Sequence, residues 1–222
     1  MGFQIERAAR RFLCGNPQKT KFIKLSCSSL SAPKDIVSIL FNNVDCLTNK
    51  FTEFLFVLKS LIEVPDVIVL LEANPKHFTK PLSISEFQIE GYQVLTSGFA
   101  SQSCRGIVAY YKEELHISEV TLCTPFKEAL CIKLALTNKT MNLLSVYESP
   151  NSSGGNNDLL IQLLEEFILL RGEHVIIGDF NFPDISWNTF SGNGSAEKIE
   201  NKFLNFLNDS FLLQHVDEPT RR

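Results

Sequence analysis

The chain has 222 residues, of which 44% are hydrophobic and 21% are charged, and its formal net charge is −4 at pH 7. With a mean hydropathy of +0.03, this is the composition of one globular domain, and it excludes a disordered chain. The sequence pI of about 5.6 excludes a protein that coats nucleic acid through global basic charge. It leaves room for a nuclease, because carboxylates that hold a cation make an active site acidic.

Cysteines and apolar runs restrict the expected partners. None of the six cysteines forms a C-x-x-C pair, so we expect reduced thiols, an intracellular setting and no disulfide-linked partner. No run approaches the ~18 consecutive apolar residues of a membrane span, so we expect no membrane partner. The sequence leaves the oligomeric state open.

Residues 1–35 differ in charge from the rest of the chain. They contain seven Lys or Arg residues against Glu6 and Asp35, and they lack clear periodicity. We interpret this segment as a basic, disordered leader and assign residues 36–222 to the folded domain. A targeting peptide is the alternative, because such peptides are rich in Arg and Ser and poor in acids.

Regular patterns begin at Ile36. Apolar and β-branched runs predict strands, at 36–41, 67–71, 106–111, 116–122, 129–136, 140–147 and 174–178. Apolar residues spaced three and four apart predict helices, at 48–64, 158–170 and 195–211, with Thr48 or Asn49 as the N-cap of the first. This mixture predicts an α/β fold in which sheets pack together with helices outside.

Four of the predicted strands each end at, or are followed by, a polar residue suited to metal or phosphate chemistry. These residues are Asn43, Glu72, Tyr147 and Asp179. Each has an ordinary structural explanation when taken alone, as a turn residue, a solvated strand end, a buried tyrosine or a cap. Because strand ends gather on one rim in layered sheet folds, the ordered set predicts a site on that rim.

The segment "HVIIGDFNFPDISW" (174–187) carries the densest chemical signal. In extended chain, Asp179 and Asn181 face the same side while Phe180 points into the core, and Gly178 lets backbone or substrate approach closely. An acid beside an amide suits phosphodiester hydrolysis, since the acid can orient or deprotonate a water and the amide can donate to developing charge. Glu72 offers the oxygen ligands that Mg²⁺ prefers.

Four blocks in this order resemble the endonuclease domain of non-LTR retrotransposons, which belongs to the endonuclease/exonuclease/phosphatase superfamily. They are "FNNVDCLTNKFTEF", "PDVIVLLEANPK", "SVYESPNSS" and "VIIGDFNFPDISW", and the tail "FLLQHVDEPTR" extends the likeness. The resemblance runs from about Ile36 to the C-terminus. It implies the DNase-I-like four-layered α/β sandwich, made of two packed mixed sheets with outer helices.

The resemblance also implies an activity and a location. In the family, Mg²⁺-dependent (or Mn²⁺-dependent) nicking of DNA supplies a 3′ hydroxyl that primes reverse transcription. The implied partner is therefore DNA, the implied cofactor is the metal ion, and the implied location is the nucleus. Organellar targeting by residues 1–35 is the alternative location.

Each site residue acquires an implied role by matching the family. Asn43 matches the amide near the metal and the phosphate, and Glu72 matches the principal metal-binding acid. Tyr147 matches the tyrosine that contacts the phosphate. Asp179 matches the acid that positions the water, and Asn181 matches the amide beside it.

The sequence also departs from the family. After "EPTR" the family continues into a strand with another Asp and then a Ser-Asp-His block, whereas this sequence stops at Arg222, and His215 matches a framework stretch. Glu148 stands where relatives often carry a basic residue, and a negative charge there would oppose a phosphate. We therefore expect a fold that is incomplete at its C-terminus, with weak or no turnover.

Two alternatives to a DNA endonuclease stay open at this point. The chain could be a catalytically inactive remnant or interaction protein that retains the fold. It could also be a phosphatase of the same superfamily with a non-DNA substrate, because substrate choice in this fold depends on surface loops.

Overall fold

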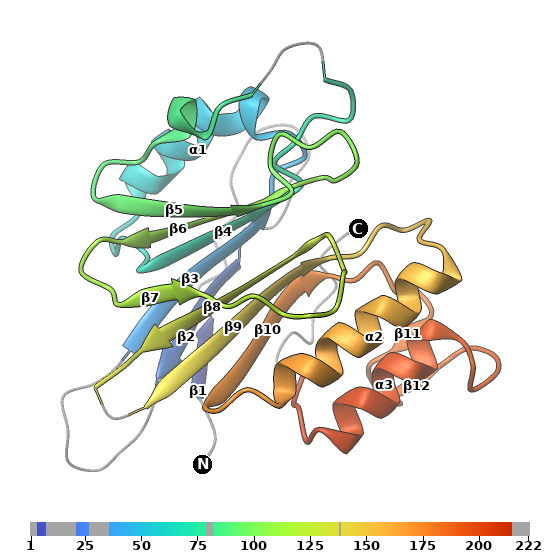
Figure 1. Cartoon of the computed structure of the whole chain (residues 1–222). Coiled ribbons are helices and arrows are strands. Elements are labelled where there is room, and N and C mark those ends of the chain that lie inside the picture. The colour runs from blue at the N-terminus through green and yellow to red at the C-terminus, as the bar shows by residue number, and fades with distance from the viewer. Residues whose placement is uncertain (1–3, 8–20, 27–35, 79–81, 138, 215–222) are drawn as a thin grey trace.

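Two β-sheets form the centre of the molecule (Figure 1). The computed structural model describes residues 4–7, 21–26, 36–78, 82–137 and 139–214. The larger sheet contains, in spatial order, β1 (Gln4–Arg7), β2 (Lys21–Ser26), β3 (Ile36–Asn43), β4 (Val67–Leu71), β6 (Ile107–Lys112) and β5 (Tyr92–Ser97). The smaller sheet contains β10 (Glu173–Asp179), β9 (Thr140–Tyr147), β8 (Ala129–Ala135) and β7 (Ile117–Glu119). A separate two-stranded ribbon joins β11 (Ile185–Ser186) to β12 (Ser191–Gly192).

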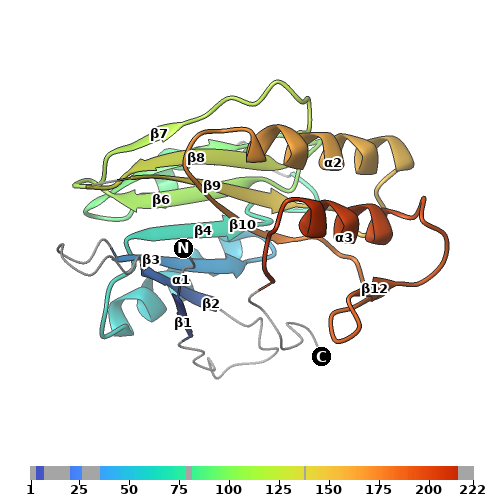
Figure 2. The same ribbon diagram turned by 90° about the horizontal axis from the view of Figure 1, so that it is seen from below.

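Helices cover the outer faces of the two sheets. On the six-stranded sheet lie α1 (Leu47–Ser60) and the 3₁₀ turn η1 (Ile84–Phe87), while α2 (Gly154–Ile168) and α3 (Ile199–Asp209) pack on the four-stranded sheet. Figure 2 shows α2 and α3 beside β9 and β10, on the side away from α1. The arrangement is a four-layered α/β sandwich, and it confirms the fold class predicted from the sequence.

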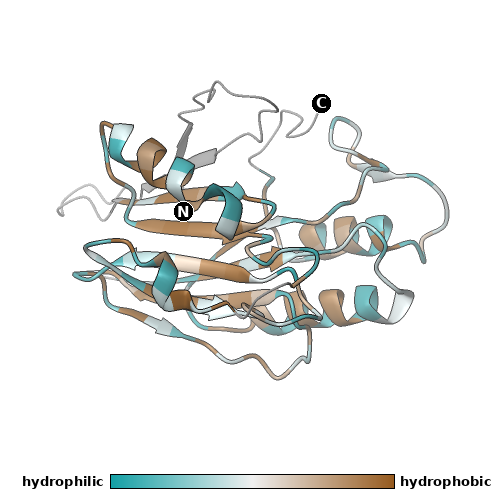
Figure 3. Cartoon of the chain, turned by 90° about the horizontal axis from the view of Figure 1, so that it is seen from above, coloured by the Kyte–Doolittle hydropathy of each residue, from teal (hydrophilic) through white to brown (hydrophobic). Residues whose placement is uncertain are grey.

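The core explains why the central strands read as continuous apolar runs. All five residues of β4 are buried, and they alternate between two clusters of side chains. Val67, Val69 and Leu71 face the other sheet, whereas Ile68 and Leu70 face α1. A strand covered on both sides has no solvent face, so it needs no polar alternation. Figure 3 shows hydrophobic residues concentrated on the strands, whereas the helices carry both hydrophobic and hydrophilic residues.

Each sheet contains one parallel pair of strands. In the larger sheet β3 runs parallel to β4, with Asn43 opposite Leu71. In the smaller sheet β9 runs parallel to β10, with Tyr147 opposite Asp179. Parallel strands end at the same edge of a sheet. The polar residues that the sequence places after these strands therefore come to the same edge in pairs.

Most predicted elements are present, with shifts at their ends. Strands 67–71 and 140–147 have the predicted bounds, and the helix predicted at 195–211 is shorter, at Ile199–Asp209. The sequence analysis missed β5, in which only Tyr92 is buried and half of the residues are polar. These shifts leave the layers and the order of the sheets unchanged.

The N-terminal segment differs from the disordered leader that the sequence predicted. Strand β2 pairs antiparallel with β3, and β1 pairs antiparallel with β2. These two strands extend the six-stranded sheet, so part of residues 1–35 belongs to the fold. The other residues of that segment lie outside the described part of the chain, and the domain boundary at residue 36 stays a prediction.

The predicted N-cap of α1 was wrong. The cap position is Cys46, and no side chain caps the helix. Instead, Cys46 N donates to Glu72 O over 2.8 Å and Leu47 N donates to Ala73 O over 2.9 Å. The chain that follows β4 thus satisfies backbone groups at the start of α1, a contact between distant segments that local sequence does not reveal.

Two further properties concern only the described residues. None of their helices combines the length and apolarity needed to cross a bilayer. Their four cysteines, Cys46, Cys104, Cys123 and Cys131, are free thiols.

Phe167→Ala is expected to lower the free energy of unfolding by about 3–5 kcal/mol, because the ring fills the core between α2 and the four-stranded sheet. The side chain is fully buried and packs edge-on against His174. Leu169→Ala, two residues away and 82% exposed, is the matched control and should change it by less than about 0.5 kcal/mol. Urea unfolding measures both, and equal losses in the two variants would contradict this packing.

Candidate active site

The structure brings together the four strand-end residues that the sequence singled out. Asn43 ends β3, Glu72 follows β4, Tyr147 ends β9 and Asp179 ends β10. The Asn43 amide joins the two sheets, since its Nδ2 donates both to Glu72 Oε1 and, over 3.1 Å, to Asp179 Oδ2. We call Asn43, Glu72, Tyr147 and Asp179 the rim cluster.

The backbone around the rim cluster is unusual. Among the described residues, seven other than glycine have positive φ, and four of these lie at this edge: Asp45, Cys46, Glu72 and Asn181. The left-handed region is uncommon for residues with a Cβ and costs free energy that packing must offset. Such conformations gather at functional sites, so the backbone supports the rim as the site.

Arg105 is the main feature that the sequence analysis missed. Its Nε and Nη2 donate to Glu72 Oε2 over 3.0 and 2.6 Å, and Nη2 also donates to Asp45 Oδ1 over 2.6 Å. Burial alone would lower the pKa of the Arg105 guanidinium. The hydrogen bonds to Glu72 and the negative charges of Glu72 and Asp45 outweigh this effect, so the pKa is raised. One sequence feature could have indicated Arg105. It is the "RG" directly before the buried strand β6, which places a cation at the edge of the sheet where Glu72 lies.

Asn74 holds the loop that delivers Arg105. Its fully buried amide donates to the carbonyl oxygens of Gly98, Ser101 and Cys104, and its Oδ1 accepts from Ala100 N. Arg105 Nη1 donates back to Asn74 O over 3.0 Å. Asn74, which lies two residues after Glu72 in "LEANPK", therefore has a structural role.

Tyr147 and Glu128 lie in the acidic surroundings of the rim. Tyr147 is buried between the sheets, and burial, followed by the charge of Glu72, raises the pKa of its hydroxyl well above the usual range. Burial also raises the pKa of Glu128, whose Oε1 accepts from Arg105 N over 2.5 Å. Tyr147 thus keeps its proton and can act as a hydrogen-bond donor toward an anion.

Glu148, where the sequence analysis expected a negative charge that opposes a phosphate, is buried. It is 1% exposed, and both its oxygens accept from Asn156 Nδ2, over 3.2 and 3.3 Å. Burial raises the pKa of this carboxyl above its usual value. Glu148 is therefore a buried, hydrogen-bonded carboxyl and not a solvated one.

Asn181 has a different setting from the one expected. Its φ of +50° ends the extended conformation from which the sequence analysis derived a shared face with Asp179. Its Nδ2 donates to Glu148 O over 2.7 Å, and Glu148 N donates to Asp179 O over 2.9 Å. Asn181 thus clamps the ends of β9 and β10 together. Its direct role toward phosphate stays a prediction.

Phe180 and Gly178 have the settings that the sequence analysis expected. Phe180 packs against the helix-side core, with its ring centroid 4.8 Å from that of Phe203. A Cβ on Gly178 would lie only 2.6 Å from Val146 O. Glycine is therefore required because the backbone of β9 passes close by, which is one of the two approaches that the sequence analysis considered.

The donor chemistry of the rim fits a hard divalent cation. Carboxylate and amide oxygens of Glu72 and Asn43 suit Mg²⁺ or Mn²⁺, with waters completing the shell, and acids outnumber bases around them. However, both oxygens of Glu72 already accept hydrogen bonds, from Asn43 and Arg105. No group of three His, Cys, Asp or Glu side chains in the described ranges is arranged to hold a metal. A cation there requires these side chains to rearrange.

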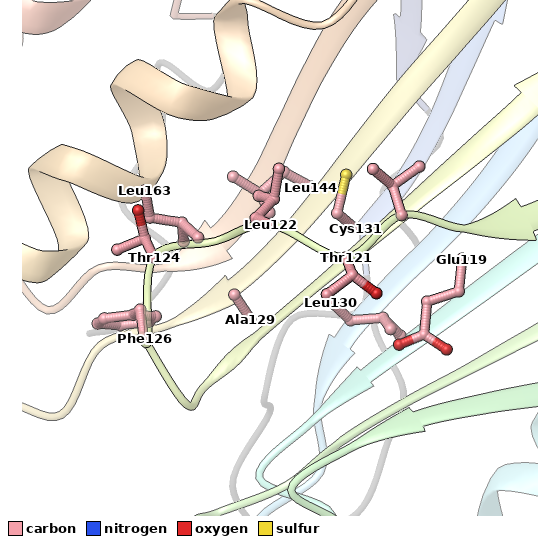
Figure 4. A pocket seen from close by; sticks show the side chains of 11 residues that line it. Glu119, Thr121, Leu122, Thr124, Phe126, Ala129, Leu130, Cys131, Leu144 and Leu163 are labelled. Atoms are coloured by element: carbon pink, nitrogen blue, oxygen red, sulfur yellow. The ribbon is translucent and has the colours of Figure 1, made fainter.

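A small cavity of about 150 Å³ lies elsewhere, between α2 and the chain that follows β7. Its lining includes Cys131, Leu144 and Leu163 together with Glu119 and Thr124 (Figure 4). None of the rim cluster lines it. The cavity is therefore separate from the candidate active site.

Comparison with known proteins agrees with this geometry. Residues 141–222 match the family model described as "Endonuclease-reverse transcriptase". AP endonuclease LMAP from Leishmania major is 15% identical, with a TM-score of 0.50, over 77% of this chain and 65% of that one. The endonuclease domain of TRAS1, a telomere-specific non-LTR retrotransposon, is 11% identical, with a TM-score of 0.49, over 78% and 69%. A search of curated proteins finds no match.

These findings support an endonuclease/exonuclease/phosphatase-type domain with a DNase-I-like fold, as the resemblance in sequence implied. The chain spans about two thirds of the length of these solved structures. The catalytic roles of the rim residues stay predictions. His215 and the rest of the "HVDEPTR" stretch lie outside the described residues.

The carboxyl of Glu148 is expected to make the free energy of unfolding fall as pH rises, and Glu148→Gln should reduce that fall. Burial raises the pKa of Glu148 above 4.5 in the folded state, so the folded chain keeps a proton that the unfolded chain has lost. This contribution is fully present below the unfolded pKa and is lost as pH rises through the folded pKa.

Urea unfolding between about pH 5 and about pH 8 measures this effect. As pH rises, the free energy of unfolding of Glu148→Gln should increase relative to that of the wild type. Glu165→Gln, which removes an exposed carboxyl from α2, controls for the change of charge. A constant difference between Glu148→Gln and the wild type would contradict the buried setting of Glu148.

Proposed function

We propose that this chain, an endonuclease/exonuclease/phosphatase-type domain, is a metal-dependent phosphodiesterase that cleaves DNA. The observation that carries the proposal is the Asn43 amide bridging Glu72 and Asp179 across the two sheets. Through these two hydrogen bonds, Asn43 links Glu72, which is suited to binding a metal, to Asp179, which is suited to orienting a water. The likeness to an AP endonuclease and the matched family model support DNA as the substrate.

The residues of the chain would divide the work of hydrolysis. Asp179 would orient a water and accept its proton as the water oxygen bonds to phosphorus and the bond to the leaving oxygen breaks. Asn43 and the protonated Tyr147 would donate hydrogen bonds to the phosphate oxygens. A divalent cation held by Glu72 and Asn43 would polarise the phosphate and stabilise the leaving oxygen.

A non-catalytic protein with the same fold is the second candidate. Its supporting observation is that both oxygens of Glu72 are engaged by side chains of the chain itself. An acid that is paired in this way can serve stability alone. We therefore expect slow turnover even from the active form, because these contacts must open first.

Asp179→Asn is expected to lower the rate of plasmid nicking by about 10²–10⁴, because it removes the base that handles the water. The assay follows conversion of supercoiled plasmid to nicked circles with Mg²⁺ or Mn²⁺. Asp184→Asn, in the same loop and about half exposed, is the matched control and should nick like the wild type.

Each alternative gives a different outcome. Nicking that persists in Asp179→Asn would reject the assigned site, and absence of nicking by the wild-type chain would favour the non-catalytic candidate. Parallel assays with bis-p-nitrophenyl phosphate and p-nitrophenyl phosphate separate a diesterase from a phosphatase. Preference for the monoester would reject the proposed substrate class.

A further inference from the structure

We propose that Arg105 is a resident cation that competes with the divalent metal for Glu72, so that Arg105 weakens metal binding and sets the metal concentration the site requires. This inference rests on the proposed function, since it takes Glu72 as the metal ligand. It assigns a role to a residue that is neither a metal ligand nor a group that handles the water.

The contacts show how closely the guanidinium engages Glu72. Two nitrogens of Arg105 donate to the same oxygen of Glu72, at 3.0 and 2.6 Å. Glu72 is 8% exposed, and 17% of the Arg105 side chain is exposed. A charge-assisted pair with little access to water is screened much less than a surface pair. The pair is therefore a strong competitor for any other cation.

Charge explains why the guanidinium and the metal exclude each other. An Mg²⁺ or Mn²⁺ ion on Glu72 would lie within a few ångströms of the guanidinium, where like charges repel strongly in a partly buried setting. Binding of the metal therefore requires the guanidinium to withdraw from Glu72.

Asp45 gives Arg105 a place to withdraw to. Arg105 Nη2 already donates to Asp45 Oδ1 over 2.6 Å, and the Asp45 side chain is 43% exposed. The guanidinium can keep this second partner while it leaves Glu72, so the exchange does not leave a buried unpaired charge. Asp45 has itself a second cation nearby, since Lys76 Nζ lies 3.6 Å from the same oxygen.

The experiment titrates Mn²⁺ into the full chain by calorimetry and follows the melting temperature at each metal concentration. Arg105→Gln should bind Mn²⁺ about tenfold more tightly than the wild type, because the competing charge is gone. Without metal it should melt at a lower temperature, and added metal should raise its melting temperature more. Arg105→Lys keeps the charge but cannot form the two-nitrogen contact, so its affinity should lie in between.

Lys112→Gln is the matched control. Lys112 forms the other ion pair between the ends of β4 and β6, with Nζ 2.7 Å from Asp66 Oδ1. Both side chains of that pair are about as buried as Arg105. Its removal should lower stability and leave the affinity for Mn²⁺ unchanged, which separates competition from general loosening of the fold.

A measurement on the wild-type chain keeps the test valid if Arg105→Gln does not fold. The NMR signal of Arg105 Nε–H, assigned by its loss in Arg105→Lys, should shift as Mg²⁺ saturates the site. In Glu72→Gln, Mg²⁺ should leave that signal unchanged. A signal that stays fixed in the wild type while Mg²⁺ saturates overturns the competition.

The outcomes separate this inference from the proposed function. Metal binding that is lost in Glu72→Gln but equally tight in Arg105→Gln and the wild type overturns only the competition. Metal binding that survives in Glu72→Gln overturns the assignment of Glu72, and both proposals with it. Absence of metal binding in both the wild type and Arg105→Gln also overturns both.

Discussion

The site depends on one constraint, which is that the carboxylate of Glu72 sits almost out of contact with water where two sheets meet. A buried charge that loses its partner destabilises a protein by about 3–5 kcal/mol. Asn43 and Arg105 are the partners that hold the Glu72 carboxylate. They come from the two sides of β4, since Asn43 ends β3 and Arg105 precedes β6. The three strands that flank Glu72 are thus tied together at the edge where the chemistry is proposed.

A second layer of contacts holds these partners in place. Asn74 lies two residues after Glu72 and binds the loop of residues 98–104, while Gly106 approaches so closely that a Cβ there would lie 2.8 Å from the Asn74 side chain. Arg105 lies between that loop and Gly106, so its backbone is held close to Glu72. On the other sheet, Asn181 fixes the junction of β9 and β10 through Glu148 O. Groups held by such outer contacts are preorganised for a reaction.

The sequence revealed the residues whose position follows from strand order. Asn43, Glu72, Tyr147 and Asp179 could be predicted because buried strands are visible as apolar runs and their ends share an edge. Arg105 could not be predicted as a partner of Glu72, because 33 residues separate them and no local rule pairs a loop cation with a strand-end acid. The burial of Glu148 could not be predicted for the same reason, since Glu148 is held by Asn156 at the start of α2. Contacts between distant side chains thus account for what the sequence left out.

The same contacts that stabilise the protein without metal oppose its proposed activity. Arg105 satisfies Glu72 and so removes the free-energy penalty of a buried acid, but a cofactor ion must overcome that pairing before it binds. Active sites commonly sacrifice stability for function, because they retain groups whose charge is satisfied only by substrate or metal. Here the charge is satisfied by the chain itself, so under the proposed competition the strength of one ion pair would determine whether the fold acts mainly as a scaffold or as a catalyst. Asp45 is the alternative partner of Arg105, so it is the residue that would let the guanidinium leave Glu72 when a metal binds.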